Sequence, residues 1–280
     1  MNRGQIRFQV RERLRKSGIP RAALEADILC SEVFGCSRED LLAHPERQVE
    51  PEEENRISSL AEARIARVPV AYLKGRASFW GLDLLVGPGC LIPRPETEVL
   101  VETALELFRK GRFLDWGTGS GCVALALLSE REEATALMME KSPLALLWAW
   151  RNLNRFPFRH RALLWHGNSI RRIPSSWLPL DLIVGNPPYI PSSEIPLLME
   201  DVRLYEPILA LDGGPDGLQD VLTILRDAEN ALVSGGWLLL EIAGSEQAET
   251  LRATSNQAFE LACVRKDFAG KERIAVWRRR

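Results

Sequence analysis

The feature that most constrains the fold is an apolar run, residues 181–185, that leads directly into Asn-Pro-Pro-Tyr at residues 186–189. A run of this length bounded by glycine and proline is typical of a buried parallel strand. Two consecutive prolines then prevent both strand pairing and an immediate helix. The sequence therefore predicts a parallel sheet with a rigid loop at the carboxyl end of this strand.

The same loop suggests a binding chemistry. Pro187 and Pro188 carry no N–H, so the loop offers backbone carbonyls, the Asn186 amide and the Tyr189 ring. We expect the ring to stack on a planar group while the Asn186 side-chain oxygen and a loop carbonyl accept two amino hydrogens. An ordinary turn is the alternative, because Asn-Pro and Pro-Pro are common in loops.

Residues 1–72 are predicted to form a small helical domain. Helix signals run over residues 4–16, 20–34 and 51–66, with a short helix after the Ser37 cap. Residues 73–95 are predicted to be a linker that contains a short hairpin, which ends at Pro93-Arg94-Pro95.

From residue 96 to residue 280 the pattern changes to alternating helices and strands, which is typical of a doubly wound α/β sheet. Two strands in the tail, separated by a polar loop, could close the sheet as an antiparallel pair. The expected strands cover residues 112–115, 134–139, 162–165, 180–184, 237–241, 259–264 and 273–277. The expected helices cover residues 96–110, 123–129, 144–154 and 218–233.

A glycine loop follows the first of these strands. Asp115 and Trp116 lead into Gly117-Thr118-Gly119-Ser120-Gly121, after which a helix begins. Glycines at alternate positions let the chain turn sharply and let a ligand lie against the backbone. The spacing is not that of dinucleotide enzymes, and no Walker lysine is present. The loop predicts a nucleotide-like cofactor, with the Asp115 carboxylate held by loop N–H groups or facing a cationic part of that cofactor.

Polar residues also end the next two strands. Glu140 lies 19 residues after Gly121, where an acid can accept hydrogen bonds from both ribose hydroxyls. Asn168 and Ser169, after the third strand, are placed to bind an adenine amino group or ring nitrogen. The alternatives are a salt-bridged surface acid at Glu140 and a plain turn at Gly167-Asn168.

Composition excludes several classes of protein. The net charge is −2, which does not call for a polyanionic partner, and no apolar run approaches the roughly 20 residues of a membrane span. The five cysteines and three histidines fall in no metal-binding spacing, so we expect no metal site and a reducing compartment. These observations predict a cytoplasmic protein that does not bind membranes.

One local charge cluster stands out near the amino terminus. Arg3, Arg7, Arg11 and Arg15 fall at helical spacing and form an arginine stripe. A solvated basic face is the favoured interpretation, and a docking surface for an acidic partner is the alternative.

The order of the glycine loop, the acid and Asn-Pro-Pro-Tyr resembles S-adenosylmethionine-dependent methyltransferases that act on amino or amide nitrogen. Within that superfamily the chain resembles the bacterial release-factor glutamine methyltransferases of the HemK/PrmC type. Further stretches that carry the resemblance are residues 69–75 (Pro-Val-Ala-Tyr-Leu-Lys-Gly), 79–81 (Phe-Trp-Gly), 91–98 (Leu-Ile-Pro-Arg-Pro-Glu-Thr-Glu), 201–203 (Asp-Val-Arg), 206–207 (Glu-Pro) and 231–236 (Ala-Leu-Val-Ser-Gly-Gly). Departures from the family pattern occur at Trp116, Glu140, Asn168 and Ala243-Gly244.

The resemblance implies a seven-stranded Rossmann-like catalytic domain and a helical domain that helps hold a class-1 peptide release factor. Its implied reaction is methylation of the glutamine in the Gly-Gly-Gln loop of that factor. Residues 117–121 and Glu140 would bind S-adenosylmethionine, and residues 186–189 would hold the glutamine amide, with Asn186 also close to the cofactor. Pro93, Arg94 and Thr97 would lie over the methionine end of the cofactor. We expect a monomer without a direct nucleic-acid partner.

Three other functions share parts of this pattern. A nucleic-acid adenine N6-methyltransferase would use the same loop for a flipped base, but the chain lacks an evident target-recognition domain and strong basicity. A ribosomal-protein glutamine methyltransferase would share the loop and differ mainly in the helical domain. In a nucleotide-binding oxidoreductase or a non-catalytic binding module, the Asn-Pro-Pro-Tyr loop would be incidental.

Overall fold

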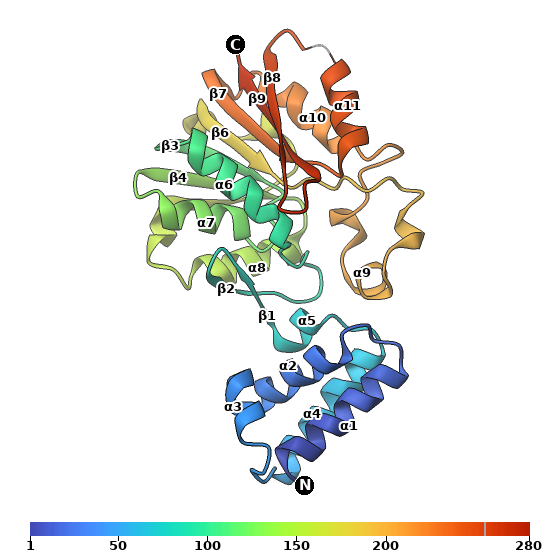
Figure 1. Cartoon of the computed structure of the whole chain (residues 1–280). Helices are drawn as coiled ribbons and strands as arrows, with labels where there is room; N and C mark the ends of the chain where they lie inside the picture. Colours follow the sequence, from blue (N-terminus) through green and yellow to red (C-terminus); the bar gives the residue numbers. More distant parts are fainter. Residues whose placement is uncertain (255) are drawn as a thin grey trace. The chain divides into compact units, whose positions relative to one another are not determined.

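The computed structural model describes residues 1–254 and 256–280, and the chain forms two compact units. We call them the helical unit, residues 1–76 with 199–205, and the sheet unit, residues 77–198 with 206–280. Figure 1 shows the elements of each unit. The short segment 199–205 thus joins a unit from which it is distant in sequence.

The helical unit is built from amphipathic helices around a core that includes Ile6, Leu14 and Leu29. Capping explains where two of the helices begin: Asn2 forms a capping box with Gln5, and the Ser37 side chain accepts the N–H of Asp40. The helices are α1 (Arg3–Lys16), α2 (Ala22–Phe34), α3 (Arg38–Ala43), α4 (Pro51–Ile65), α5 (Val70–Lys74) and α9 (Glu200–Tyr205). The helix α5 was not predicted from the sequence.

Ion pairs and hydrogen bonds hold α9 in the helical unit. Arg64 on α4 is buried, and its guanidinium lies 2.6 Å from Glu25 and 3.4 Å from Asp201. The Tyr205 hydroxyl donates to the carbonyl of Ala66 at 2.6 Å. Nothing in the local sequence of α9 predicts this placement, because it depends on partners more than 130 residues away.

The sheet unit contains a seven-stranded sheet with the order β5-β4-β3-β6-β7-β9-β8. The first five strands in this order are parallel, and β9 pairs antiparallel with both of its neighbours, so the predicted fold class is confirmed. The strands are β3 (Gly111–Trp116), β4 (Ala134–Glu140), β5 (Ala162–His166), β6 (Leu180–Gly185), β7 (Leu232–Glu241), β8 (Phe259–Lys266) and β9 (Glu272–Arg279), and a separate hairpin consists of β1 (Arg76–Phe79) and β2 (Leu82–Leu85).

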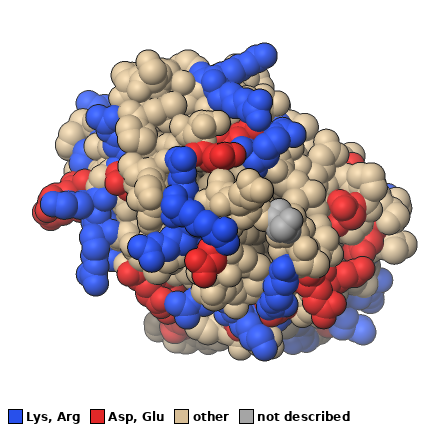
Figure 2. All heavy atoms as spheres, turned by 90° about the horizontal axis from the view of Figure 1, so that it is seen from above, with Lys and Arg blue, Asp and Glu red and all other residues tan. Residues whose placement is uncertain are grey.

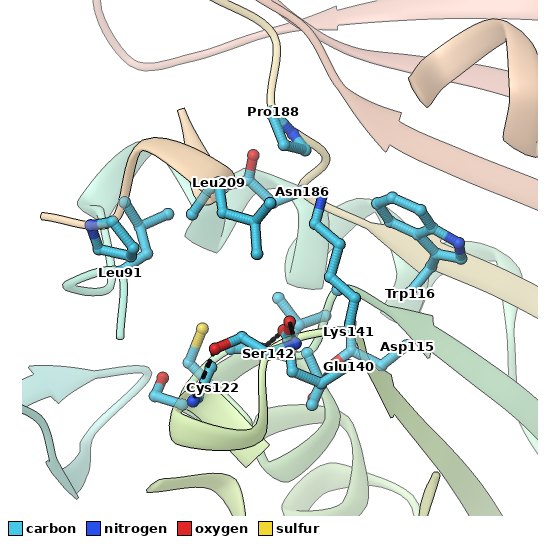
Figure 3. A pocket seen from close by; sticks show the side chains of 18 of the residues that line it. Leu91, Asp115, Trp116, Cys122, Glu140, Lys141, Ser142, Asn186, Pro188 and Leu209 are labelled. Atoms are coloured by element: carbon cyan, nitrogen blue, oxygen red, sulfur yellow. Dashed lines mark hydrogen bonds between the residues drawn. The ribbon is translucent and has the colours of Figure 1, made fainter. Parts of the chain in front are cut away.

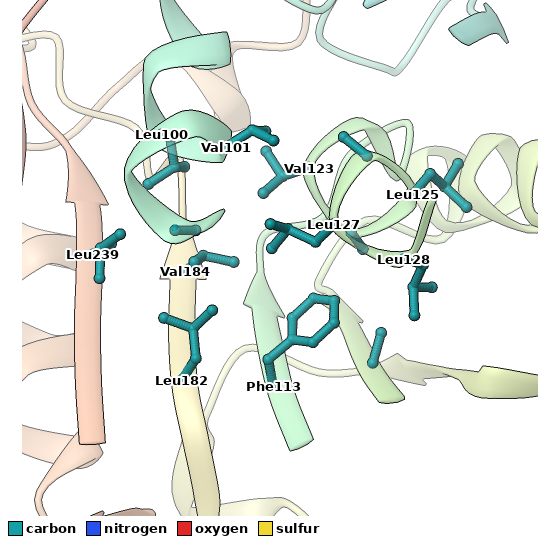
Figure 4. Close-up of a cluster of buried hydrophobic side chains, with 14 of the residues drawn as sticks. Leu100, Val101, Phe113, Val123, Leu125, Leu127, Leu128, Leu182, Val184 and Leu239 are labelled. Atoms are coloured by element: carbon teal, nitrogen blue, oxygen red, sulfur yellow. The ribbon is translucent and has the colours of Figure 1, made fainter. Parts of the chain in front are cut away.

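Two hydrophobic cores cover the two faces of the sheet, as a doubly wound fold requires. Successive residues of β3 illustrate this, because Phe113 packs in one core and Leu114 in the other. Figure 4 shows the first core, where side chains of α6 and α7 meet those of the strands. Helices α6 (Glu98–Leu107), α7 (Cys122–Glu130) and α8 (Pro143–Leu153) contribute to the first core, and α10 (Gln219–Ala228) and α11 (Ser245–Ala253) to the second.

The helix expected over residues 218–233 ends earlier than predicted. It stops at Ala228, and β7 already begins at Leu232, which pairs with Leu180 of β6. The Leu180 N–H donates to the carbonyl of Ala231 at 2.7 Å, so pairing with β6 takes this segment out of the helix. The prediction was wrong here because apolar residues of a buried strand and of a helix face cannot be separated by local periodicity alone.

The strand register places the first residues at or after the ends of four strands, Gly117, Glu140, Asn186 and Glu241, next to one another. Trp116 of β3 pairs with Met139 and Gly185, so Gly117 follows beside both Glu140 and Asn186. Gly185 also pairs with Leu240, which places Asn186 beside Glu241 at the end of β7. A Cβ at Gly185 would lie 2.9 Å from the carbonyl oxygen of Trp116, so this close approach of β3 and β6 requires glycine.

Among the described residues, no helix is both long enough and apolar enough to cross a membrane.

Candidate active site

An open cavity lies at the carboxyl ends of β3, β4 and β6, where the strand order reverses. Most residues of the predicted site meet there. The cavity is lined by Pro93, Arg94, Thr97, Asp115, Gly117, Thr118, Gly119, Ser120, Glu140, Asn168, Asn186 and Pro188. Four other predicted site residues, Gly121, Ser169, Pro187 and Tyr189, do not line it.

The glycine loop leaves open space on the cavity side. Gly117 and Gly119 have φ angles of 68° and 57°, in the left-handed region that favours glycine. A Cβ built on Gly117 would have no neighbour within 4 Å, and one on Gly119 would approach only the carbonyl oxygen of Gly117. A ligand can therefore lie directly against this backbone.

The carboxylate of Glu140 is held rigidly at the end of β4. It is buried, one oxygen accepts the N–H of Gly119 at 3.0 Å, and the other accepts the N–H of Ser142 at 2.8 Å. Each oxygen of a carboxylate can accept a second hydrogen bond. Figure 3 shows Glu140 and Ser142 across the cavity from Asn186 and Pro188. Glu140 therefore presents fixed acceptors to a ligand.

Asp115 is buried beneath the glycine loop. Its Oδ2 accepts hydrogen bonds from the Thr118 hydroxyl at 2.5 Å and from the N–H of Ala124 at 3.2 Å. Burial raises its pKa to about 7, although both hydrogen bonds favour the charged form. Loop N–H groups were expected to hold Asp115, but the N–H comes from the first turn of α7, and the loop supplies the Thr118 hydroxyl instead.

Asn186 has a defined amide orientation at the rim of the cavity. Its Nδ2 donates to the Thr97 hydroxyl at 3.1 Å, and Thr97 is buried. Its Oδ1 has no hydrogen-bond partner among the residues that the structure describes. The amide therefore offers an acceptor to a ligand in the cavity, as predicted from the sequence.

Tyr189 lies behind the rim and contacts Glu241. Its hydroxyl donates to Glu241 Oε1 at 3.1 Å, and burial raises the pKa of this phenol. The ring was expected to stack on a planar ligand, but it is not part of the cavity wall. Pro188 is the member of the loop besides Asn186 that lines the cavity.

Arg94 is fixed by an acid that the sequence analysis did not assign to the site. Its Nη2 lies 2.5 Å from Glu206 Oε1, while Glu206 Oε2 accepts the N–H of Ile92 at 3.0 Å. Glu206 is buried. These contacts hold the segment from Ile92 to Thr97 at the cavity, with Arg94 already neutralised by Glu206.

Sequence reasoning assigned no binding role to several apolar residues that the structure places in the wall. They are Leu91, Cys122, Val123, Ala145, Pro207, Leu209 and Ala210. Glu241 was also missed, although the rule that drew attention to Glu140, an acid at the end of a buried strand, applies to it equally. Residues 1–254 and 256–280 contain no cluster of metal-ligating side chains.

The parallel sheet, the cavity at its switch point and the family match of the same region together define a Rossmann-like methyltransferase. Residues 95–199 match the methyltransferase small domain, and residues 5–75 match the PrmC N-terminal domain. A methyltransferase from Pyrococcus furiosus has a similar fold, with a TM-score of 0.51 and 19% identity over 78% of this chain and 98% of that one.

The chain belongs to the release factor glutamine methyltransferases. It is 36% identical over 270 residues to the release factor glutamine methyltransferase of Rhodospirillum rubrum, covering 96% of this chain and 82% of that protein. It is 37% identical over 273 residues to the one of Nitratidesulfovibrio vulgaris, covering 96% and 92%. The family resemblance expected from the sequence is confirmed.

S-adenosylmethionine is the cofactor of this class, and the cavity fits it. The side-chain-free surface at Gly117 and Gly119 leaves room for a ligand against the loop, and Glu140 offers fixed carboxylate acceptors. The wall combines these polar groups with apolar side chains such as Leu91 and Val123, which suits the adenosine and aliphatic parts of the cofactor.

Proposed function

We propose that this chain methylates the side-chain amide nitrogen of the glutamine in the Gly-Gly-Gln motif of class-1 peptide release factors. The observation that carries this proposal is the Asn186 amide, held by Thr97 with its oxygen free to accept an N–H from a planar amide. Membership in the release factor glutamine methyltransferases supports the same substrate.

We assign the cofactor contacts as follows. Glu140 binds the ribose hydroxyls, and Gly117, Thr118, Gly119 and Ser120 form the surface on which the cofactor lies. Asp115 stabilises the loop from below through Thr118. Asn168 and the neighbouring Ser169 bind the adenine side, although only Asn168 lines the cavity.

Pro93, Arg94 and Thr97 form the wall at the methionine end. Because Glu206 already pairs with Arg94, we expect Arg94 to shape this wall and bind a carboxylate with its remaining N–H groups. For Gly121 we propose a structural role and no direct contact with the cofactor. Its φ angle of 86° allows the turn into α7.

S-adenosylmethionine supplies an activated methyl group whose sulfur is the leaving group. The work of the protein is to place the amide nitrogen in line and to stabilise the positive charge that develops on it. The Asn186 oxygen and a carbonyl of the Pro187-Pro188 segment accept the two N–H bonds, which orients the amide nitrogen toward the methyl group and stabilises the positive charge that develops on it during transfer. Tyr189 supports this loop through Glu241. The amide proton leaves to water after transfer.

We propose that residues 1–72 recognise the release factor, that residues 73–95 link the two domains and that residues 96–280 carry catalysis. We further propose a cytoplasmic monomer that does not act on nucleic acid. On the face shown in Figure 2, Lys and Arg side chains lie interspersed with Asp and Glu side chains, which supports the absence of a polyanion-binding surface on that face.

A panel of substrates tests the reaction. Labelled S-adenosylmethionine is offered in parallel with a class-1 release factor, total ribosomal protein and duplex DNA. We expect label on the release factor, in the peptide that contains Gly-Gly-Gln. Label only on DNA or only on ribosomal protein would overturn the proposal.

The Asn186→Ala variant tests the role of the loop. We expect turnover to fall by about 100-fold or more, the scale of losing one positioned transition-state partner, with cofactor affinity within a small factor. Asn154→Ala, an exposed asparagine at the end of α8, is the matched control and should retain full turnover. Unchanged turnover in Asn186→Ala would exclude the proposed role.

A further inference from the structure

The turn between β8 and β9 holds an aromatic side chain in open solvent. Phe268 in this turn is 89% exposed, more than any other large apolar side chain that the structure describes. A phenyl ring in water forgoes the favourable burial that apolar surface gains against other apolar groups. Single exposed apolar side chains are common on protein surfaces, so the place of Phe268 in the fold decides whether it has a role.

The turn is built rigidly around Asp267. Its Oδ1 accepts the N–H groups of Ala269 and Lys271 at 3.0 Å and 2.9 Å. Its side chain is buried, and its Oδ2 accepts the Nε–H of Arg273 at 3.0 Å. The backbone that carries Phe268 is therefore fixed before a partner binds, so little conformational entropy is lost on binding.

The same turn lies at the carboxyl edge of the sheet, where the cavity opens. Ile274 of β9 pairs with Glu241 at the end of β7, and Figure 1 shows the β8–β9 hairpin turning just beyond that end of β7. The neighbouring Arg273 donates to the carbonyl of Ala243 at 2.7 Å. Because Asn186 also lies beside Glu241, Asn186 and Ile274 are two strand spacings apart, roughly 10 Å.

A protein that presents a glutamine to the cavity must cover this edge of the sheet. An interface of ordinary size buries about 800 Å² on each partner and so extends roughly 15 Å from its centre. An interface centred on the cavity therefore reaches the turn. Further apolar surface lies at the cavity itself, because Leu209 lines it and is half exposed, and the adjoining Ile208 is also exposed.

We propose that Phe268 is an anchor for the release factor and fills an apolar depression on its surface near the Gly-Gly-Gln loop. Aromatic side chains that fill a pocket on a partner often dominate the binding energy of an interface. This inference rests on the proposed function and adds to it a docking contact outside the cavity. It gives Phe268 a role in binding the whole protein substrate and none in the transfer of the methyl group.

The Phe268→Ala variant tests the anchor. We expect the Kd for the release factor, measured by calorimetry with S-adenosylhomocysteine present, to rise by about 10-fold or more. The kcat at saturating release factor and the Kd for S-adenosylmethionine should stay within about twofold of wild type, because Phe268 does not line the cavity. Phe268→Leu should keep most of the affinity, since leucine can fill the same apolar depression.

Trp150→Ala is the matched control. Trp150 is an exposed aromatic residue in the second half of α8, a helix that begins at the carboxyl edge and leads away from it. The variant should keep the wild-type Kd for the release factor.

Photocross-linking gives a second test that does not depend on affinity. Phe268→p-benzoylphenylalanine should cross-link on irradiation to release-factor peptides close to Gly-Gly-Gln. Trp150→p-benzoylphenylalanine should give no such product.

Three outcomes would overturn the inference: an unchanged Kd for Phe268→Ala, an equal rise in Kd for Trp150→Ala, or a cross-link from position 268 to a second copy of this chain instead of the release factor. Each would leave the proposed reaction intact, since the wild type would still methylate the release factor. Failure of the wild type to label a release factor would instead reject the proposed function itself.

Discussion

Three acidic residues at the carboxyl edge of the sheet, Asp115, Glu140 and Glu241, differ in environment although each lies within the last two residues of a buried strand. Glu140 accepts two backbone N–H groups and stays available to a ligand. Asp115 and Glu241 lie deeper, and burial raises the pKa of each to about 7. An acid at the end of a buried strand can therefore either accept hydrogen bonds from a ligand or support the loops around the site. The contacts around each carboxylate decide which of the two roles it has.

The raised pKa of Asp115 predicts a pH dependence of stability. The folded state binds this proton more tightly than the unfolded state, where the pKa is near 3.8. The stabilisation is complete below pH 3.8 and is lost as the pH rises through about 7. Between pH 5 and pH 8 the wild type should lose on the order of 2 kcal/mol more than Asp115→Asn.

Urea unfolding of both proteins at pH 5 and pH 8 measures this difference. Asp83→Asn, at an exposed position outside the cavity, should follow the wild type. Parallel pH curves for the wild type and Asp115→Asn would contradict the prediction.

At the scale of elements, the sequence predicts the strands of the sheet better than the surroundings of the site. Strand periods and glycine or proline boundaries are local, so all seven expected strands are present in β3 to β9. The end of α10 was missed because pairing with β6 decides it, and α5 was missed because a five-residue helix shows little periodicity. Glu206 and the apolar cavity wall were missed because their roles depend on contacts distant in sequence.

The roles of the arginines in the stripe on α1 also depend on contacts distant in sequence, and one of these contacts leads to a prediction. Asp27 on α2 is buried and accepts Arg7 at 2.5 Å and Arg38 at 2.8 Å. Burial alone would raise the pKa of Asp27, but the two arginines outweigh it and lower that pKa. Arg7→Gln removes one partner of a buried charge and should cost about 1–3 kcal/mol of stability.

Arg15→Gln is the matched control, because Arg15 pairs with Glu12 on the solvent side of the same helix. It should change stability by less than about 0.5 kcal/mol. The free energy of unfolding in urea, followed by helical circular dichroism, distinguishes the two variants. Equal effects would mean that the Arg7 pair does not support the bundle.

For the whole molecule, the question is how the helical unit takes part in substrate binding. The stripe does not act as one surface: Arg3 and Arg7 pair with Asp40 and Asp27 within the bundle, and Arg11 and Arg15 pair with Glu12. A change at Arg7 would therefore mix folding with binding. Only Arg11 and Arg15 can test the stripe as a docking surface.

The double variant Arg11→Glu/Arg15→Glu should leave the KM for the release factor within about twofold of wild type, as expected for a solvated, locally paired face. Arg109→Glu/Lys110→Glu, at exposed positions of the sheet unit, makes the same change in net charge and controls for long-range attraction. Equal small increases in KM for the two double variants would show only that long-range electrostatic attraction had been lost. Added salt should then abolish the difference in KM from the wild type. A tenfold increase in KM confined to the Arg11 and Arg15 variant, with kcat unchanged, would instead identify the stripe as a contact with the release factor.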